Sequence, residues 1–370
     1  MASGTRDGLL IAGGGLAGSL AAIAMAKSRP EVPVLLVEEK ESFGGDHLWW
    51  FFEDDVDEAE RWLIEPLIDR SWPGYYVAFP ERSRKLKGAI SCIRSDAVDQ
   101  AVREALRPDQ YRLGTKAVAV RDNELVLLGG ERIKAGGAID ARGAANLSML
   151  ELGWQKSFGR EYVFASPHRV DRPVLVDATV EQTGGLRFMR CLPFSDTRML
   201  VEDVEYSDSA EADAAAAAAR LDSYIATRKW QSASVEREEE RVLPVPTGGD
   251  FGAFWRVGGA RVAKIGMRGG FFHPTSGHSL GDAVRSAITL TKQGDFGGAA
   301  LHDLFEEEAA ASWRKRDLQR GFNAGLFGAK TEERRRHFDD FYALDPALIG
   351  RFQSGRMGLL DKMRLGKLVR

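Results

Sequence analysis

Short apolar runs and helical patterns alternate along the first forty residues. Residues 9–12 (LLIA) form an apolar run of strand length, residues 19–27 (SLAAIAMAK) are rich in helix-forming residues, and residues 34–38 (VLLVE) form a second apolar run. A strand, a helix and a second strand in this order predict a βαβ unit whose two strands lie parallel in a buried sheet.

The turn between the first strand and the helix carries three glycines, Gly13, Gly15 and Gly18, and Glu38 ends the second strand. In a dinucleotide-binding unit the first glycine permits the tight turn, the second lets the backbone approach a pyrophosphate, and the third lets the helix pack closely on the strand. The diphosphate then lies at the helix N-terminus, and the acid accepts hydrogen bonds from a ribose hydroxyl. The spacing therefore predicts a bound dinucleotide.

The pattern becomes less regular after this unit. The glycine-rich, aromatic stretch 43–55 has neither a helix nor a strand period and predicts a loop, while residues 57–67 predict an amphipathic helix. Residues 95–107 predict a helix with Ser95 as its N-cap. Short strands are expected at residues 75–79, 84–86, 117–120 and 124–128.

Longer strand patterns begin at residue 174. The segments 174–182, 186–194 and 197–206 predict a mainly antiparallel sheet, and the alanine tract 212–219 belongs to an ordinary helix. The sheet resumes at 242–245, and everything after residue 299 has a helical pattern. We expect a cofactor-binding domain formed by residues 6–153 and 256–298, a substrate lobe at 154–255 and a helical region at 299–370.

Composition adds constraints on the class of protein. The chain has 370 residues, 44% of them hydrophobic, with a net charge of −3, which favours a globular enzyme and disfavours nucleic acid as a partner. Cys92 and Cys191 form no motif and read as reduced thiols of a cytosolic protein. The six histidines are scattered, so no metal site is expected.

One alternative for the N-terminus is a secretory signal, because residues 8–26 form an uncharged apolar run behind Arg6. The three glycines in strand-turn register, followed by a second strand, disfavour it. No other segment is long and apolar enough to span a bilayer, so the sequence predicts a soluble or peripheral protein.

A second glycine-rich motif follows at residues 265–287. It resembles the aromatic hydroxylases, in which a late strand, a proline and a glycine border a flavin and a helix points at its rings. Gly266, Pro274 and Gly277 occupy these places, while Met267 stands where the hydroxylases carry an aspartate. The dinucleotide implied is FAD, bound by an α/β fold of the two-dinucleotide-binding-domain type with an inserted lobe and a helical C-terminus.

The segment 138–143 (AIDARG) resembles the strand that re-enters this type of sheet beside the cofactor. It adds Asp140 and Gly143 to the candidate cofactor residues.

The chain as a whole resembles the flavin-dependent lycopene β-cyclases of bacteria. The resemblance is carried by GGDHLWWFF (44–52), WLIEPLI (62–68), WPGYYVAFPERSRKLKGAISCI (72–93), DARG (140–143), GWQKSFG (153–159), DATVEQ (177–182), LVEDVEY (200–206), GFFHPTSGHSL (270–280) and FDDFYALDPALIGRF (338–352). Arg241 is a departure, since a small residue is expected before the VLP run.

The resemblance implies a reaction without net redox. A proton adds to a terminal alkene of lycopene, the cation closes a six-membered ring, and loss of another proton gives a β-ionone ring, so the product is β-carotene by way of γ-carotene. It also implies reduced FAD, with NADH or NADPH as the reductant, and a substrate dissolved in the membrane.

The segment LVEDVEY resembles the acidic motif of the family, and Glu202 matches its first acid. On an alternating strand Glu202 points to one face and Asp203 to the other, toward solvent or the flavin edge. A carboxyl group in an apolar channel keeps its proton more readily and can donate it. Glu202 and Asp203 are therefore the candidate catalytic residues; the alternative is a solvated strand face.

Aromatic residues supply the candidate substrate lining. Trp49, Trp50, Phe271 and Phe272 lie in the two glycine-rich segments expected to border the flavin, where their faces would stabilise a carbocation. Core packing is the alternative for each ring. His47 and His278 are better explained as structural histidines.

The C-terminus from Arg351 onward interleaves six basic residues with apolar ones, including Leu360 and Met363. Such a helix can lie on an anionic membrane surface, which predicts a cytoplasmic protein bound to the inner face of the cell membrane. Packing on the body of the protein is the alternative. Two other functions stay open: a monooxygenase or prenyl reductase of the same fold, and a non-catalytic prenyl carrier.

Overall fold

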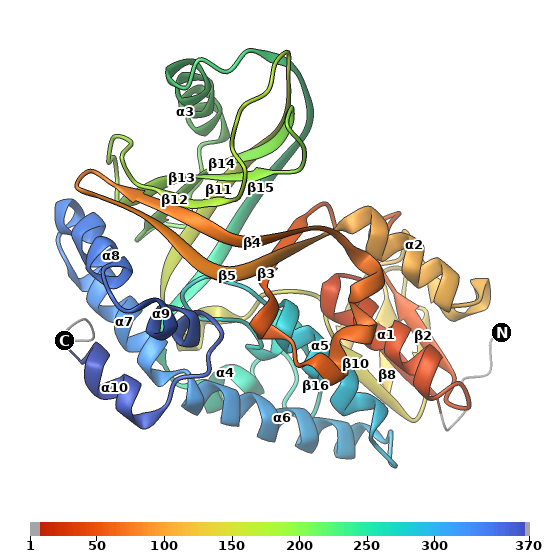
Figure 1. Ribbon diagram of the computed structural model, residues 1–370. Helices are drawn as coiled ribbons and strands as arrows, with labels where there is room; N and C mark the ends of the chain where they lie inside the picture. Colours follow the sequence, from red (N-terminus) through yellow and green to blue (C-terminus); the bar gives the residue numbers. More distant parts are fainter. Residues whose placement is uncertain (1–7, 367–370) are drawn as a thin grey trace.

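The computed structural model describes residues 8–366. It has two halves, each built on one large sheet, and the chain passes between them more than once (Figure 1). The cofactor half is built on a five-stranded parallel sheet in the order β16-β10-β1-β2-β6. Its strands are β1 (Leu9–Ala12), β2 (Val34–Val37), β6 (Tyr111–Arg112), β10 (Gly137–Asp140) and β16 (Ala263–Lys264).

Helices cover one face of this sheet, and a smaller three-stranded sheet covers the other. Helix α1 (Leu16–Ser28) lies between β1 and β2 in sequence and packs against α5 (Leu280–Thr291) and α2 (Ser95–Ala105). The side chains of β1 and α1 are almost wholly buried, as the all-apolar pattern of a parallel sheet requires. The predicted βαβ unit is confirmed, because β1 pairs in parallel with β2.

A long helix and a small sheet complete the cofactor half. Helix α6 (Gly298–Lys315) packs on β16 and β10. A three-stranded sheet forms from β7 (Ala117–Val120), β8 (Glu124–Leu127) and β9 (Arg132–Lys134).

The substrate half is an eight-stranded, mainly antiparallel sheet in the order β15-β11-β14-β13-β12-β4-β5-β3. Its β12 and β4 pair in parallel, which joins an early hairpin to the later strands. The strands are β3 (Leu48–Phe52), β4 (Ile68–Phe79), β5 (Arg82–Arg94), β11 (Leu150–Phe164), β12 (Val174–Asp177), β13 (Leu186–Pro193), β14 (Arg198–Ser207) and β15 (Ser232–Gly249).

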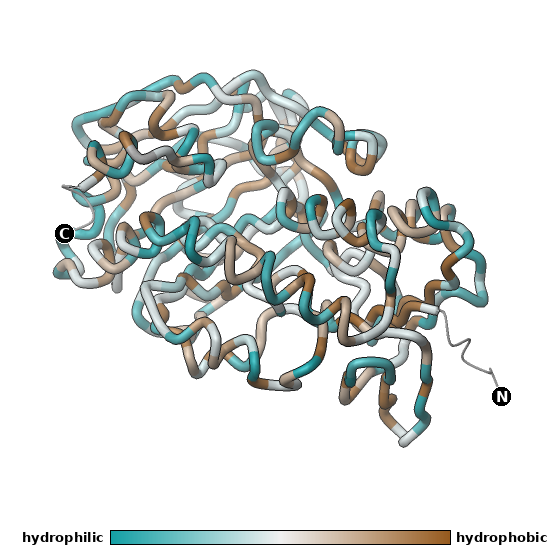
Figure 2. Tube along the Cα trace, turned by 90° about the horizontal axis from the view of Figure 1, so that it is seen from below, coloured by the Kyte–Doolittle hydropathy of each residue, from teal (hydrophilic) through white to brown (hydrophobic). Residues whose placement is uncertain are grey.

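Different helices cover the two faces of this sheet. Helix α3 (Ala214–Thr227) packs on the outer face, against β14 and β11. The inner face packs against α7 (Asp317–Gly328), α8 (Arg334–Tyr342) and α9 (Pro346–Gln353), whose aromatic residues join its core. Short helices α4 (Phe251–Arg256) and α10 (Leu359–Leu365) lie in the lower part of Figure 1, α4 just above α6 and α10 at the lower left. Seen from below, hydrophobic stretches alternate with hydrophilic ones along the chain (Figure 2).

The structure corrects several local predictions. Residues 57–67 form the 3₁₀ turns Glu58–Leu63 and Glu65–Leu67 and not an α-helix, because Pro66 lacks a donor N–H and interrupts the helix. The expected loop at 43–55 contains strand β3, whose period is hidden because four of its five side chains are buried. Ser95 is the first residue of α2, and Arg94 is the N-cap. The expected strand at 174–182 ends at Asp177.

Candidate functional site

The three N-terminal glycines have the geometry that a dinucleotide loop requires. Gly13 has φ +101°, and a Cβ there would lie 2.7 Å from the backbone of Ala141. A Cβ on Gly18 would lie 1.9 Å from the carbonyl oxygen of Gly13, so α1 can approach β1 only because residue 18 is glycine. A Cβ on Gly15 would meet nothing within 4 Å, so this glycine faces open space.

The open space next to Gly15 is a groove of about 490 Å³, here called the cofactor groove. Among the predicted cofactor residues, Gly13, Gly15, Glu38, Gly143 and Gly266 line it. The Glu38 carboxylate accepts hydrogen bonds from the backbone N–H of Gly14 (2.5 Å) and of Lys40 (2.9 Å), which fixes it at the edge of the groove. The donor set and the open face of Gly15 fit a dinucleotide.

Two arginines close the far side of the cofactor groove. Arg142 and Arg268 line it and both bind the carboxylate of Asp140, at 2.8 Å from Nη2 and from Nε respectively. Burial raises the pKa of Asp140, but the two arginines outweigh burial and hold this pKa below its ordinary value. Asp140 is therefore a buried anchor for groove residues and lies behind the groove wall.

The other predicted cofactor residues lie further from the glycine loop. Pro274 is buried in the segment between β16 and α5. Gly277 has φ +72° and lines a second cavity of about 270 Å³, here called the junction cavity. The junction cavity shares His47, Trp49, Met267 and Ser279 with the cofactor groove, so the two spaces are adjacent.

A third space, the aromatic pocket, adjoins the junction cavity on its other side. The two share Trp50, Arg190, Ser276 and His278. The aromatic pocket has a volume of only about 50 Å³, because rings from the inner face of the sheet and from α7, α8 and α9 fill it. Its ring-bearing wall consists of Trp50, Phe52, Phe188, Tyr206, Phe322, Phe338, Phe341, Tyr342 and Phe352.

Buried polar contacts fix the walls between these spaces. The Tyr206 hydroxyl donates to the carbonyl of Thr275 (2.8 Å), which ties the sheet to the segment before α5. Trp50 meets His278 edge to face at 4.0 Å between ring centroids, and the Arg190 guanidinium lies 4.9 Å from the Trp50 ring centroid. Burial, followed by nearby Arg241, lowers the pKa of His47 to about 4, so its imidazole is neutral at neutral pH.

The two candidate acids lie on opposite faces of β14. Glu202 is 2% exposed and points to the inner face, where its Oε2 is 3.0 Å from Nη1 of Arg190. Asp203 is 3% exposed and points to the outer face, where Arg187 and Arg220 each bind it at 2.7 Å. Asp203 thus faces α3, and neither solvent nor the flavin edge as the sequence suggested.

The position of Glu202 differs from the apolar setting expected for it. Its carboxylate lies behind Arg190, which lines both the junction cavity and the aromatic pocket. A guanidinium in contact favours the charged form of a carboxyl group. Glu202 itself lines none of the three cavities and contacts them only through Arg190.

Comparison with known proteins agrees with the geometry. The family model described as lycopene cyclase protein matches residues 8–369. The lycopene beta-cyclase of Pantoea ananas is 36% identical over 358 residues, covering 96% of this chain and 93% of the relative. That of Pseudescherichia vulneris is 36% identical over 361 residues, with coverage of 97% and 93%.

The chain belongs to the lycopene cyclase family. The resemblance inferred from the motifs is confirmed.

Solved structures confirm the fold class. A geranylgeranyl bacteriochlorophyll reductase-like protein from Thermoplasma acidophilum aligns with TM-score 0.63 at 13% identity, covering 99% of each chain. A flavin-dependent halogenase from Xanthomonas campestris aligns with TM-score 0.63 at 12% identity, covering 98% of this chain and 94% of that one. At such identities the likeness concerns the fold alone.

Of the four aromatic residues suggested for the substrate, two line the cavities. Trp49 lines the cofactor groove and the junction cavity, and Trp50 lines the junction cavity and the aromatic pocket. Phe271 is 5% exposed and meets Phe305 edge to face in the core of the cofactor half. Phe272 is also buried, and its carbonyl accepts a hydrogen bond from Arg316 (2.9 Å).

The sequence reasoning missed Arg190, Glu239 and most of the aromatic pocket. The rings of α8 and α9 come from a segment that carried the family resemblance but no assigned role. Arg241, noticed as a departure from the family pattern, lines the junction cavity and binds Glu239. That departure from the family pattern was the signal in the sequence that drew attention to Arg241.

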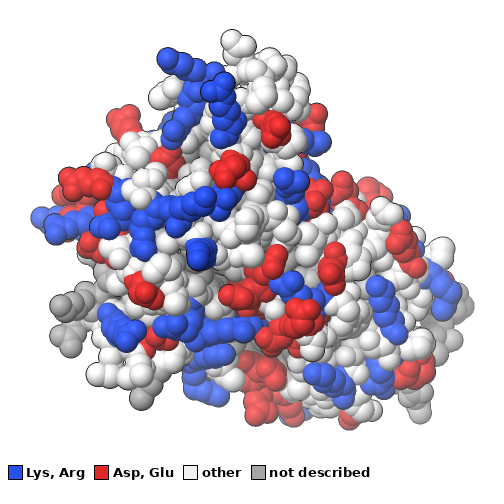
Figure 3. Space-filling view, in the orientation of Figure 1, with Lys and Arg blue, Asp and Glu red and all other residues white. Residues whose placement is uncertain are grey.

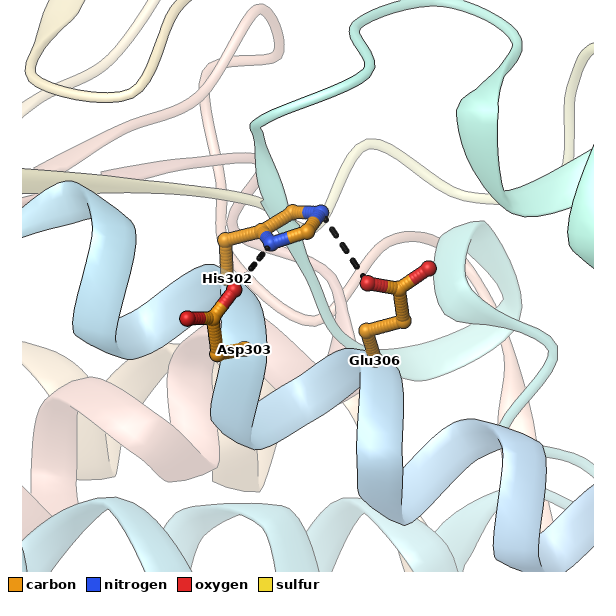
Figure 4. A group of neighbouring side chains, drawn as sticks. All are labelled: His302, Asp303 and Glu306. Carbon is orange, nitrogen blue, oxygen red and sulfur yellow. Dashed lines mark hydrogen bonds and ion pairs between the residues drawn. The ribbon is translucent and has the colours of Figure 1, made fainter.

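One cluster in the described residues has the composition of a metal site: His302, Asp303 and Glu306 on α6 (Figure 4). His302 Nδ1 is 2.9 Å from Asp303, and its Nε2 accepts a hydrogen bond from the Trp255 indole N–H at 3.3 Å. Both ring nitrogens are therefore engaged. The cluster anchors Trp255, which is fully buried.

Proposed function

We propose that this protein is a lycopene β-cyclase that binds FAD in the cofactor groove and closes β-ionone rings at the junction of its three cavities. The observation that carries the proposal is their continuity: the groove and the ring-lined pocket each share wall residues with the junction cavity between them, and Arg190, which lines the junction cavity and the pocket, is ion-paired with the buried Glu202. An apolar polyene end and a dinucleotide can thus meet beside a carboxyl group.

The residues have separate roles in this proposal. Gly13, Gly15 and Gly18 shape the diphosphate site at the N-terminus of α1, and Glu38 accepts from a ribose hydroxyl. Bound in its reduced form, FAD would supply negative charge beside a cationic reaction intermediate. NADH or NADPH would supply the electrons that reduce it.

The aromatic side chains hold the apolar end group and exclude water. Trp49 and Trp50 lie where the junction cavity meets its neighbours, and a ring face stabilises a nearby cation by about 0.5–2 kcal/mol. Glu202 handles the proton that adds to the terminal alkene. Asp203 acts from the opposite face, where Arg187 of β13 and Arg220 of α3 bind it, and so orients its neighbour.

We further propose that the C-terminal helix contacts an anionic membrane surface. On α10, Leu360 and Met363 are 72% and 77% exposed beside Lys362 and Arg364, a combination that suits the interface of a bilayer. Lys367, Leu368 and Arg370 lie outside the described residues. Within residues 8–366 the structure contains no helix that is long and apolar enough to cross a membrane.

Acidic and basic side chains both occur across the face drawn in Figure 3, and the net charge of the chain is −3, which does not favour nucleic acid as a partner. The proposed substrate is instead a lipid-soluble polyene.

The proposal is tested by expressing the protein in a host that accumulates lycopene and separating the pigments by chromatography. The expected products are γ-carotene and β-carotene. Hydroxylated or hydrogenated pigments would instead identify a monooxygenase or a reductase of the same fold.

A further inference from the structure

Four residues stand in one row across four neighbouring strands of the inner face. The register pairs Arg190 on β13 with Glu202 on β14, Glu202 with Gly159 on β11, and Gly159 with Glu239 on β15. Residues paired in this way point to the same side of a sheet. The row, here called the acid row, therefore reads arginine, glutamate, glycine, glutamate.

The glycine brings the two carboxylic side chains together. A Cβ on Gly159 would lie 2.9 Å from Cγ of Glu202 and 3.4 Å from Cγ of Glu239, so both side chains lean over the space that a larger residue would fill. Glu202 is 2% exposed and Glu239 is 6% exposed. Two buried carboxyl groups this near to each other resist being ionised together.

Glu239, the second acid of the row, is linked by hydrogen bonds to the segment that borders the cofactor groove. Glu239 accepts a hydrogen bond from the backbone N–H of Leu48 (3.2 Å) and is ion-paired with Arg241, which donates to the Leu48 carbonyl (2.8 Å). Leu48 follows His47, a residue of both the groove and the junction cavity. Glu239 thus connects the cofactor loop to Glu202.

The charged groups around the acid row favour the protonated form of Glu239 over that of Glu202. Burial raises the pKa of Glu239, and the neighbouring Glu202 raises it further, although Arg241 opposes both. Glu202, in contrast, has Arg190 in contact. The side chain of Arg190 is 10% exposed, and its Nε has no hydrogen-bond partner among the described residues. A buried N–H donor next to the junction cavity is therefore unsatisfied.

We propose that Glu239 is the proton-holding partner of Glu202, a positioning residue through which the two carboxyl groups share one proton for ring closure. This inference rests on the proposed function. A carboxyl O–H bond breaks as a C–H bond forms on the terminal alkene; after the ring C–C bond forms, a ring C–H bond breaks, its electrons form the ring double bond, and the proton returns to the carboxylate. No oxidant or reductant is consumed, and the pair exchanges its proton with water between turnovers.

The titratable and charged groups that face the pair support this assignment. The pKa of His47 is about 4 and that of His278 lies well below its ordinary value, both through burial, so both are neutral at neutral pH. The groups that surround the pair are Arg190, Arg237, Arg241, His47 and His278.

The test measures kcat against pH for the FAD-loaded protein and its Glu239→Gln variant. The amide removes the second carboxyl group, so the proton of the pair is no longer held in place by repulsion between two carboxylates. We therefore expect the alkaline limb of the profile to move down by about one pH unit or more, with activity recovered in acid. Glu239→Asp should restore most of the wild-type profile.

Matched controls separate this role from a structural one. Glu238→Gln changes the preceding residue, which is half exposed on the outer face and pairs with Arg160, and should leave the profile unchanged. An unshifted limb in Glu239→Gln, with flavin content and helix content retained, would contradict the inference. Absence of ring products with the wild-type protein would contradict the proposed function instead.

Discussion

The cofactor groove takes its shape from the backbone, whereas the aromatic pocket takes its shape from side chains that distant segments bring together. Gly13, Gly15 and Gly18 lie within six residues of each other and leave a groove of about 490 Å³. The aromatic pocket draws on β3, β13, β14 and three C-terminal helices, and its rings leave about 50 Å³. The groove is ready for its ligand, and the pocket must open for a polyene.

The two regions also suit different kinds of chemistry, ligand recognition in the groove and proton transfer at the sheet. The groove presents backbone donors and an acid at its rim, which suits recognition of a phosphate and a ribose. The inner face of the eight-stranded sheet presents paired acids and arginines beneath rings, which suits handling of protons in a dry site. Changes in one region should therefore leave the other intact.

The largest effect is expected from Gly15→Leu. The new side chain would project into the open groove without a clash in the protein, so the fold should survive while flavin binding and all activity are lost. Absorbance of the purified variant measures the flavin. Gly18→Leu is the contrasting variant, since its Cβ would clash with the Gly13 carbonyl and reduce stability itself. A yellow, active Gly15→Leu protein would contradict the assignment of the groove.

Glu202→Gln should retain the flavin and lose turnover by roughly a hundredfold or more, because the amide cannot donate a carboxylic proton. Asp203→Asn, on the opposite face, should lose much less. Initial rates with lycopene in liposomes compare the two. Equal losses would mean that the two faces of β14 are not functionally distinct, and full activity in Glu202→Gln would remove this residue from the mechanism.

The ion pair between Arg316 and Asp282, where the cofactor half meets the C-terminal helices, is expected to stabilise the folded protein. Arg316 binds the buried Asp282 of α5 at 2.7 Å, between the cofactor half and the helices over the pocket. Arg316→Met should lower the free energy of unfolding by about 3 kcal/mol, since it leaves a buried carboxylate with one partner fewer. Urea unfolding measures this, with the exposed Arg314→Met as the control. Equal stability of both variants would contradict it.

The same pair predicts a pH dependence. Burial raises the pKa of Asp282, but Arg316 and Arg285 outweigh burial and hold it at about 2, below its ordinary value. A lowered pKa in the folded state contributes stability that is present above about pH 4 and is lost as the pH falls toward 2. The wild-type protein should therefore lose more stability between pH 5 and pH 2 than Arg316→Met does, by unfolding experiments at each pH.

The smallest effect is expected at the membrane surface. Lys362→Gln and Arg364→Gln should each weaken binding to anionic liposomes by about 1 kcal/mol, and added salt should weaken binding of the wild-type protein. Cosedimentation measures the bound fraction. Lys134→Gln, on β9 of the cofactor half, is the matched control. Identical binding of all three variants would assign α10 a packing role.

The cofactor half could be predicted from the sequence because its signals are local. The glycine spacing, Glu38 and the apolar strands lie within thirty residues, and each has one physical reason for its residue type. The family motifs extended the prediction over the whole chain. The errors were also local: Pro66 broke the expected helix, and burial on both faces hid the period of β3.

The substrate half could be predicted only in part, because its contacts depend on register. Alternation on β14 correctly separated Glu202 from Asp203, but it could not tell which strand supplies Arg190 or that Gly159 leaves room for a second acid. Glu239 stands in a run of charged residues that reads as a solvated strand. Pairing over a separation of eighty residues decides its environment.

The central claim is that the acid row adds and removes protons without net redox. The direct measurement is cyclisation of lycopene in deuterated water by the FAD-loaded protein, with deuterium in the product and nicotinamide oxidation followed together. The account predicts one deuterium in each ring formed and no nicotinamide oxidised in step with product. Rings without deuterium, or one nicotinamide oxidised for each ring, would contradict it.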